Sequence, residues 1–296
     1  MVRVRLVSGF MALMCLVVFP EISNASSAEG LKHRGWLASM GMDKDQSALK
    51  KARELFLQAR KLDPNDADID YLIGFTYFKE GEFALIHEED KEKARELYEK
   101  ALASCEEGLE KDPENLECRF GRAACLARIL DTKYSGKSML NNVFSLGGIV
   151  PKLRMIEKDT QYVISKTQNM NPDIHESYDY TYFSMVMRAS LDWFYPRIIG
   201  GGKEKAIGQL MEAAKRRLND PLPYYTMARL YFEIDKDYAK AKEYCVKVLE
   251  WERPYYFFDD YAFYRPHCER ILRTIQTKTA SVKPQIPASA AFNSNR

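Results

Sequence analysis

Residues 52–64 read Ala-Arg-Glu-Leu-Phe-Leu-Gln-Ala-Arg-Lys-Leu-Asp-Pro, and the spacing within this stretch decides the fold class. Ala52, Phe56, Ala59 and Pro64 stand at offsets 0, 4, 7 and 12. The first three share one face of an α-helix. Their two small side chains let a second helix approach closely, and the aromatic ring fills the groove between the helices. Because the proline then ends the helix, the stretch predicts the second helix of a helical hairpin.

The same spacing returns further along the chain. Offsets 0, 4 and 7 are occupied by Ala94, Tyr98 and Ala101 in one copy and by Ala206, Leu210 and Ala213 in another, and a fourth copy includes Ala241. Ala206 and Ala241 are 35 residues apart, close to the period of about 34 of the tetratricopeptide repeat. Over residues 44–255 the chain therefore resembles the tetratricopeptide-repeat family.

Partner helices are expected between these copies. First helices of the hairpins are predicted over residues 67–79, 115–130, 173–195 and 221–232. In the earliest of them, Gly74 is the small residue at which the partner helix crosses. The pattern weakens over residues 131–172, where Gly147, Gly148 and Pro151 interrupt it. We expect an irregular unit there.

The resemblance implies an architecture. Helical pairs of this kind cannot bury their apolar faces alone, so they stack. We expect an all-α, right-handed superhelical solenoid of about five helix-turn-helix pairs over residues 44–276. Residues 26–43 are predicted to be a loosely ordered lead-in, and the small, polar residues 277–296 a disordered tail. The concave surface of such a solenoid is its default binding groove.

The N-terminal segment has the features of a signal peptide. Two arginines precede an uncharged apolar run over residues 7–19, and Ser23 and Ala25 place small residues where a signal peptidase cleaves. The run is shorter than the roughly 20 residues of a membrane-spanning helix. We therefore expect export, with residues 1–25 removed after Ala25, and a periplasmic location in a bacterium.

Two alternatives stay open for this segment. Instead of a cleaved signal peptide, the segment could form a buried N-terminal helix. It could also carry a lipid anchor at Cys15, although Met14 is bulkier than the residue that a lipidation signal prefers. No later run of residues is long and apolar enough to cross a bilayer. We expect no membrane span in the mature chain.

Charge and composition exclude several classes of protein. The chain has 44 Lys and Arg against 42 Asp and Glu, a formal net charge of +2. Such a balance gives no basic surface for nucleic acid, so we expect no nucleic-acid partner. Hydrophobic residues make up 46% and charged residues 29%, which excludes global disorder.

The sequence carries no recognisable catalytic or metal-binding motif. The histidines form no His-Glu-x-x-His pattern, and no Gly-x-Ser-x-Gly occurs. Residues 135–138 resemble the end of a phosphate-binding loop, but Asp131 stands where the first glycine is needed. We therefore predict a protein that is not an enzyme and requires no metal and no cofactor.

The cysteines permit two interpretations. All but Cys15 follow the predicted cleavage site, and these are Cys105, Cys118, Cys125, Cys245 and Cys268. No Cys-x-x-Cys pair occurs, so neither a zinc ribbon nor a thioredoxin-type motif is supported. The cysteines are either small buried hydrophobes, or disulfides join Cys105 to Cys118 and Cys245 to Cys268.

A glycine-rich segment leads into the third copy of the helical pattern. Residues 195–206 read Tyr-Pro-Arg-Ile-Ile-Gly-Gly-Gly-Lys-Glu-Lys-Ala. Together with the export signal, this segment resembles the glycine-rich turn of the periplasmic T-component proteins of TRAP transporters, over residues 170–275. The resemblance implies that Gly200 and Gly201 form a turn, and that the protein has a hydrophobic ligand channel and associates with a solute receptor.

Aromatic residues suggest where a partner or ligand binds. Tyr178 and Tyr182 stand four residues apart on one helix face, and Tyr combines a large contact area with a polar tip. With Met185, Tyr77 and Tyr231 they are the predicted binding residues.

Two functions follow from these observations. The first is a non-enzymatic, exported scaffold that binds a protein partner, which the sequence does not identify, in its concave groove. The alternative is a component of a TRAP transporter that binds a small apolar solute together with a receptor. An enclosed apolar channel favours the solute, and an open groove favours a peptide or protein.

Overall fold

The computed structural model describes residues 26–42, 45–134, 146–169, 179–194, 201–218, 220–251 and 259–281. Over these residues the chain is all-α, with helices and turns and no strand. No helix in this part of the chain has the length and apolar character needed to cross a membrane. The predictions for the signal peptide, Cys15, Ala25, Tyr178 and Gly200 lie outside the described residues.

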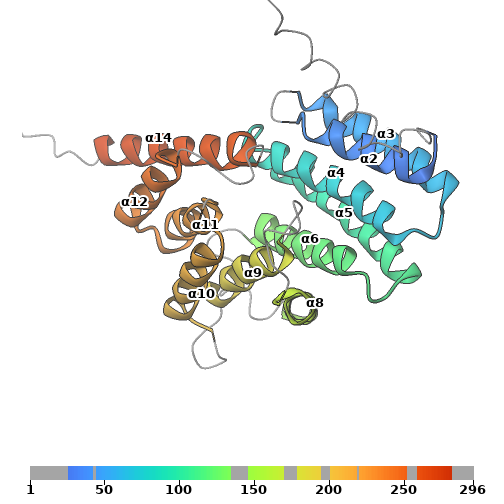
Figure 1. Cartoon of the computed structure of the whole chain (residues 1–296). Helices are drawn as coiled ribbons and strands as arrows, with labels where there is room; N and C mark the ends of the chain where they lie inside the picture. The colour runs from blue at the N-terminus through green and yellow to red at the C-terminus, as the bar shows by residue number, and fades with distance from the viewer. Residues whose placement is uncertain are drawn as a thin grey trace, which may run out of the picture.

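The helices follow one another as packed neighbours (Figure 1). They are α2 (Ala28–Ser39), α3 (Ser47–Leu62), α4 (Ala67–Ile86), α5 (Lys91–Lys111), α6 (Leu116–Tyr134), α8 (Leu146–Thr167), α9 (Tyr180–Phe194), α10 (Lys203–Arg216), α11 (Leu222–Leu230), α12 (Tyr238–Leu249) and α14 (Arg265–Ser281). Two one-turn π-helical segments, η4 (Tyr231–Asp235) and η5 (Asp260–Tyr264), adjoin α11 and α14. Each helix contacts the next one in the series.

The alanine pattern lies at the contacts between helices. The pattern residues of α3, α5, α10 and α12 are fully buried: Ala52, Phe56, Ala59, Ala94, Tyr98, Ala101, Ala206, Leu210, Ala213 and Ala241. Pro64 is exposed in the turn after α3. A Cβ atom on Gly74 would lie 3.0 Å from the carbonyl oxygen of Ala101, so α4 and α5 approach closely there. The small residues therefore set the spacing between paired helices.

The irregular middle unit differs from the sequence prediction. Helix α8 runs without a break through Gly147, Gly148 and Pro151. Its apolar face packs against α6 and α9, and this burial offsets the hydrogen bond that a proline removes. Helix α9 begins at Tyr180 rather than at residue 173, because the Asp179 carboxylate accepts the Tyr182 N–H at 3.0 Å and caps the helix there.

Both ends of the helical series are longer than predicted. Residues 28–39 of the expected loose lead-in form α2, which Ser27 caps by accepting the N–H of Gly30 at 3.1 Å. This helix packs on α3. Helix α14 continues to Ser281, so the predicted disordered tail does not begin at residue 277. No proline interrupts this stretch before Pro284, and a helix continues until such a signal ends it.

The C-terminal segment returns to α4 and closes a ring of helices. Helices α4, α6, α9 and α11 contact one another in that order, and η5 contacts both α11 and α4 (Figure 1). The rings of Phe83 and Phe263 meet edge to face, with centroids 4.9 Å apart. His87 Nε2 lies 2.6 Å from the carbonyl oxygen of Ala262. These contacts join segments that are far apart in the sequence, and the five elements border a common space.

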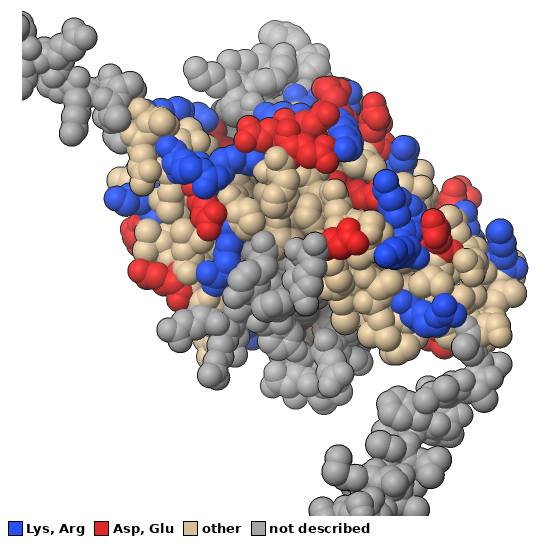
Figure 2. All heavy atoms as spheres, turned by 90° about the horizontal axis from the view of Figure 1, so that it is seen from above, with Lys and Arg blue, Asp and Glu red and all other residues tan. Residues whose placement is uncertain are grey.

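Acidic and basic side chains alternate over the molecular surface. Figure 2 shows Lys and Arg interspersed with Asp and Glu on the face seen from above. Many of them form pairs one helical turn apart, such as Lys247 with Glu243 and Lys215 with Glu212. The opposite charges in such pairs cancel, so the net charge of each region is close to zero. This face therefore has no electrostatic potential of a single sign.

Packing at Gly81 of α4 gives a first testable prediction. A Cβ atom there would lie 2.6 Å from Cε1 of Tyr98, whose hydroxyl donates to Glu82 at 2.6 Å and holds the ring in place. We expect Gly81→Ala to destabilise the fold by about 1–3 kcal/mol, measured by urea unfolding.

The matched control is Gly208→Ala in α10, where no atom lies within 4 Å of an added Cβ. This variant gains helix propensity without a clash, so its stability should rise by about 0.5–1 kcal/mol. Equal effects of the two substitutions would contradict the packing at Gly81.

Candidate functional site

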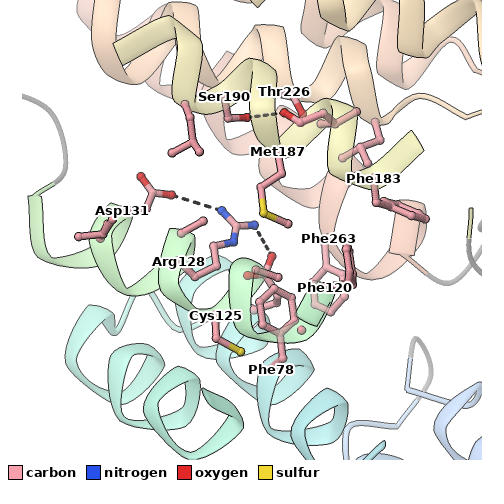
Figure 3. A pocket seen from close by; sticks show the side chains of 18 of the residues that line it. Phe78, Phe120, Cys125, Arg128, Asp131, Phe183, Met187, Ser190, Thr226 and Phe263 are labelled. Carbon is pink, nitrogen blue, oxygen red and sulfur yellow. Dashed lines mark hydrogen bonds and ion pairs between the residues drawn. The ribbon is translucent and has the colours of Figure 1, made fainter. Parts of the chain in front are cut away.

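The ring of helices borders a partly open cavity of about 220 Å³. Its walls come from α4, α6, α9, α11, η4 and η5, and most of its lining is apolar (Figure 3). The larger apolar side chains include Phe75, Phe78, Phe120, Met187, Leu191 and Phe263. A dry cavity of about 150 Å³ already accommodates benzene. The space is therefore large enough for a small organic molecule.

One edge of the cavity carries an alternating chain of charges. Arg128 of α6 donates to Glu82 of α4 and, at 3.3 Å, to Asp131 one turn further along its own helix. Arg229 of α11 also donates to Asp131. Figure 3 shows Arg128 and Asp131 beside the space that Met187 borders. Burial opposes the ionisation of Asp131, but Arg229 and Arg128 hold its pKa below the ordinary value. The carboxylate therefore bridges two arginines.

Glu233 and His267 continue this charged edge. The Glu233 carboxylate lies 4.0 Å from both the Arg229 guanidinium and His267 Nε2. Burial raises the pKa of Glu233, and Arg229 only partly opposes this effect. Burial and nearby arginines lower the pKa of His267 well below its ordinary value, while its Nδ1 lies 2.8 Å from the hydroxyl of Tyr225. The imidazole is therefore neutral at pH 7.

A second hollow, of about 330 Å³, lies on the other side of the charged edge. It shares Arg128, Asp131, Tyr225, Arg229 and Glu233 with the apolar cavity. Its remaining charged lining is mostly basic, with Lys91, Lys236 and Arg270 against Glu89. The charged edge thus separates an apolar chamber from a polar, mainly basic one.

The described part of the chain shows neither a metal-binding cluster nor an activated thiol. Within the described ranges, no group of His, Cys, Asp and Glu is arranged to hold a metal ion. Cys105, Cys118, Cys125, Cys245 and Cys268 are buried free thiols, and neither open disulfide pairing is formed. A hydrogen bond with Cys125 and burial raise the pKa of Cys105 well above its ordinary value, and burial raises that of Cys118. Such thiols are poor nucleophiles.

Of the binding residues predicted from the sequence, the four that the structure describes do not line the cavity, and Tyr178 lies outside the described residues. Tyr182 is fully buried in the core, and Tyr231 packs against Trp193 and Tyr244, with ring centroids 5.0 and 5.7 Å away. The guanidinium of Arg53 covers the ring of Tyr77 at 4.0 Å. Met185 packs at the edge of the main hydrophobic cluster. In these positions the side chains stabilise helix packing.

The described part of the glycine-rich segment begins at Gly201, and Gly200 lies outside it. Gly201 is buried before α10, and Gly202 has φ of 122°, a conformation that side chains disfavour. The Gly202 N–H also donates to the carbonyl oxygen of Asp192 at 2.8 Å. Gly202 therefore sets the entry of the chain into α10.

The charged edge was not found by sequence reasoning. Arg128, Arg229 and Glu82 lie on three different helices, so no local motif joins them. One signal was available: Arg128 follows Leu126 and Ala127 and precedes Ile129 and Leu130, an apolar run that interrupts the expected polar face. A charge within such a run is a candidate for a buried pair.

Comparison with known proteins leaves the family undetermined. No protein-family model matches this chain, and no curated protein matches it. The function is therefore inferred from the cavity and from the residues around it.

Proposed function

We propose that this protein binds a small, largely apolar organic molecule in the cavity between α4, α6, α9, α11 and η5, and that it catalyses no reaction. The observation that carries the proposal is the apolar lining of this cavity of about 220 Å³. Ligand sites surround a small molecule with apolar side chains and orient it with a few polar groups. This cavity has both kinds of side chain, and its volume suits a small solute.

We also propose a repeat architecture, a location and a partner for this protein. The helices are proposed to form a right-handed solenoid of tetratricopeptide-like pairs, supported by the buried alanine pattern and by the contact of each helix with the next. Export to a periplasm and association with a solute receptor are supported by the N-terminal sequence and by the glycine-rich turn. In this setting the protein passes its ligand to or from the receptor.

A scaffold function is the second proposal. Apolar side chains are exposed on and beside α2 and α3, at Leu37, Met40 and Leu62. These lie away from the cavity and offer contact area to a protein partner. Native mass spectrometry of the protein purified from its own cells distinguishes the two proposals, because a small retained mass supports ligand binding and a second chain at fixed stoichiometry supports the scaffold.

A cavity-filling substitution tests the proposed function directly. Ala124 lines the cavity from α6, so Ala124→Phe places a ring inside it. N-phenyl-1-naphthylamine is a neutral apolar probe whose fluorescence rises when it leaves water. We expect the wild type to bind this probe at one site, and Ala124→Phe to weaken binding at least about tenfold, or 1.4 kcal/mol.

The matched control is Ala103→Phe, which adds the same ring at an exposed position of α5. It should bind the probe as the wild type does. Circular dichroism and thermal unfolding of both variants establish that they are folded. Equal probe binding by the two variants would place the ligand elsewhere and contradict the proposal.

A further inference from the structure

We infer that the cavity is selective for single-chain amphiphiles that have an anionic head group. The head group is a carboxylate, which binds at Arg229 beside Arg128. The apolar chain of the ligand lies inside the cavity. This inference rests on the proposed function and adds the chemical class of the ligand. It draws on the donors of Arg229, the charges around the two chambers and the position of the charged edge.

Arg229 has hydrogen-bond donors that the protein leaves unused. Its side chain is only 13% exposed. Its Nη1 atom donates to Asp131 and lies 4.0 Å from Glu233. Among the described residues, none accepts a hydrogen bond from its Nε or Nη2. A guanidinium has five N–H donors. Because Arg229 lines the cavity, its Nε and Nη2 donors are available to an anionic group bound there.

The charges around Arg229 favour an anion over a cation. Arg128 and Arg229 face two carboxylates, Glu82 and Asp131, which they neutralise. Glu233 is the remaining acidic group at the edge, and its raised pKa favours the uncharged form. Glu233 also lies 4.0 Å from the Arg229 guanidinium, so each carboxylate at the edge has an arginine beside it and a cationic head group meets both arginines. In a buried site, that repulsion costs far more than it does in water.

The polar chamber supplies the route for a charged head group. Its basic groups, Lys91, Lys236 and Arg270, outnumber Glu89. A mainly basic hollow attracts anions and raises their local concentration. It adjoins the cavity at Arg229 and Glu233, which line both spaces. An amphiphile bound with its head at this boundary has its chain among apolar residues.

The apolar chamber fits the chain of such a molecule. Phe78 of α4, Phe120 of α6 and Met187 of α9 line it on three sides (Figure 3). Methionine is flexible and polarisable, so it adapts to the shape of a bound chain. An amphiphile can therefore place its head group at Arg229 and, at the same time, its apolar chain against these residues.

Three ligands of equal chain length test the selectivity. Dodecanoate, 1-dodecanol and dodecyltrimethylammonium differ only in the charge of the head group, and each is measured by displacement of N-phenyl-1-naphthylamine. We expect dodecanoate to bind at least tenfold more tightly than dodecanol, and the cationic ligand to bind most weakly. If all three bind the wild type equally, the head-group inference is overturned, but the cavity function stands. If neither the probe nor any amphiphile binds, both proposals fail.

Substitution of Arg229 locates the head group. We expect Arg229→Gln to remove the preference, so that the affinity ratio of dodecanoate to dodecanol falls about tenfold while dodecanol binds as before. Arg229→Lys keeps the positive charge but lacks the planar set of N–H donors of a guanidinium. It should give an intermediate affinity ratio of dodecanoate to dodecanol. It provides a second variant if Arg229→Gln does not fold.

The matched control is Arg122→Gln. Like Arg229, Arg122 of α6 is largely buried against a carboxylate, with two hydrogen bonds of 2.8 Å to Asp159 of α8, but it does not line the cavity. This variant should lose stability without changing the affinity ratio. An unchanged ratio in Arg229→Gln, or an equal fall in Arg122→Gln, overturns the assignment of the head group to Arg229.

Discussion

Replacing Asp259 with alanine is expected to destabilise the protein by about 3–5 kcal/mol. Asp259 accepts from Lys79 at 2.5 Å, and their side chains are only 3% and 5% exposed. The Lys79 ammonium also lies over the rings of Phe75 and Phe263, at 5.3 and 5.4 Å. Without its carboxylate, the charge stays buried among aromatic rings and uncompensated. Urea unfolding measures the loss.

A double substitution distinguishes the ion pair from simple packing. In Lys79→Met with Asp259→Leu, both charges are replaced by apolar groups, and most of the lost stability should return. The exposed pair of Lys93 and Glu88 is the control, because Glu88→Ala removes a partner in open solvent and should change stability by less than about 1 kcal/mol. Similar losses in Asp259→Ala and Glu88→Ala would contradict the burial of the pair.

The same pair connects stability with the proposed ligand site. It joins α4 to the segment that carries η5, and both Lys79 and Asp259 line the cavity. If the ring opens, the cavity loses one wall. Asp259→Ala should therefore also weaken binding of the neutral probe, whereas the double variant restores it.

The substitution Asp220→Asn should increase the free energy of unfolding at high pH but not at low pH. Burial raises the pKa of Asp220 from 3.8 to about 6, although the Leu222 N–H, Arg217 and Tyr182 oppose the shift. The folded state thus holds the Asp220 proton more tightly than the unfolded state does. The contribution of this group is fully present below about pH 4 and is lost as pH rises through about 6. At 1.36 kcal/mol per pKa unit, the loss is on the order of 3 kcal/mol.

Asparagine keeps the contact that Asp220 makes with the start of α11. The Oδ1 atom accepts the Leu222 N–H at 3.0 Å, and an amide oxygen does so equally well. We therefore expect Asp220→Asn to gain up to about 3 kcal/mol at pH 8 and almost nothing at pH 4. Urea unfolding at the two pH values measures the difference.

Asp45 supplies a control of opposite sign. Hydrogen bonds from Ser47 lower its pKa, so its contribution is present above its unfolded pKa and is lost as pH falls through its folded pKa. Asp45→Asn should lower stability at pH 8 and have no effect in strong acid. A gain for Asp220→Asn that is the same at pH 4 and pH 8 would contradict the pKa shift.

The local pattern was sufficient to predict the helices. Ala52, Phe56 and Ala59 stand on one helix face whatever the rest of the chain does, because the spacing of 3.6 residues per turn is a local property. All three are fully buried in the structure. Pro151 shows the limit of local rules, since α8 continues through it. The contacts that outweigh the proline come from α6 and α9, which the local sequence of α8 does not contain.

Burial of charge was the feature that the sequence analysis did not predict. Lys79, Glu82 and Arg128 belong to no recognisable motif in the sequence. In the fold, Lys79 and Glu82 are buried and Arg128 lies between Glu82 and Asp131. Each charge is tolerated inside because another helix brings its partner. No single helix carries that information.

The sequence by itself determined the class of structure: an all-α chain with small residues at the positions where neighbouring helices cross. These follow from periodicity and steric size, which act over a few residues. The tertiary structure alone decided that the chain closes on itself, because Lys79 and Asp259 are 180 positions apart and share no pattern. That closure forms the apolar cavity and places Arg229 at its edge, since a cavity depends on which helix faces meet across the whole fold.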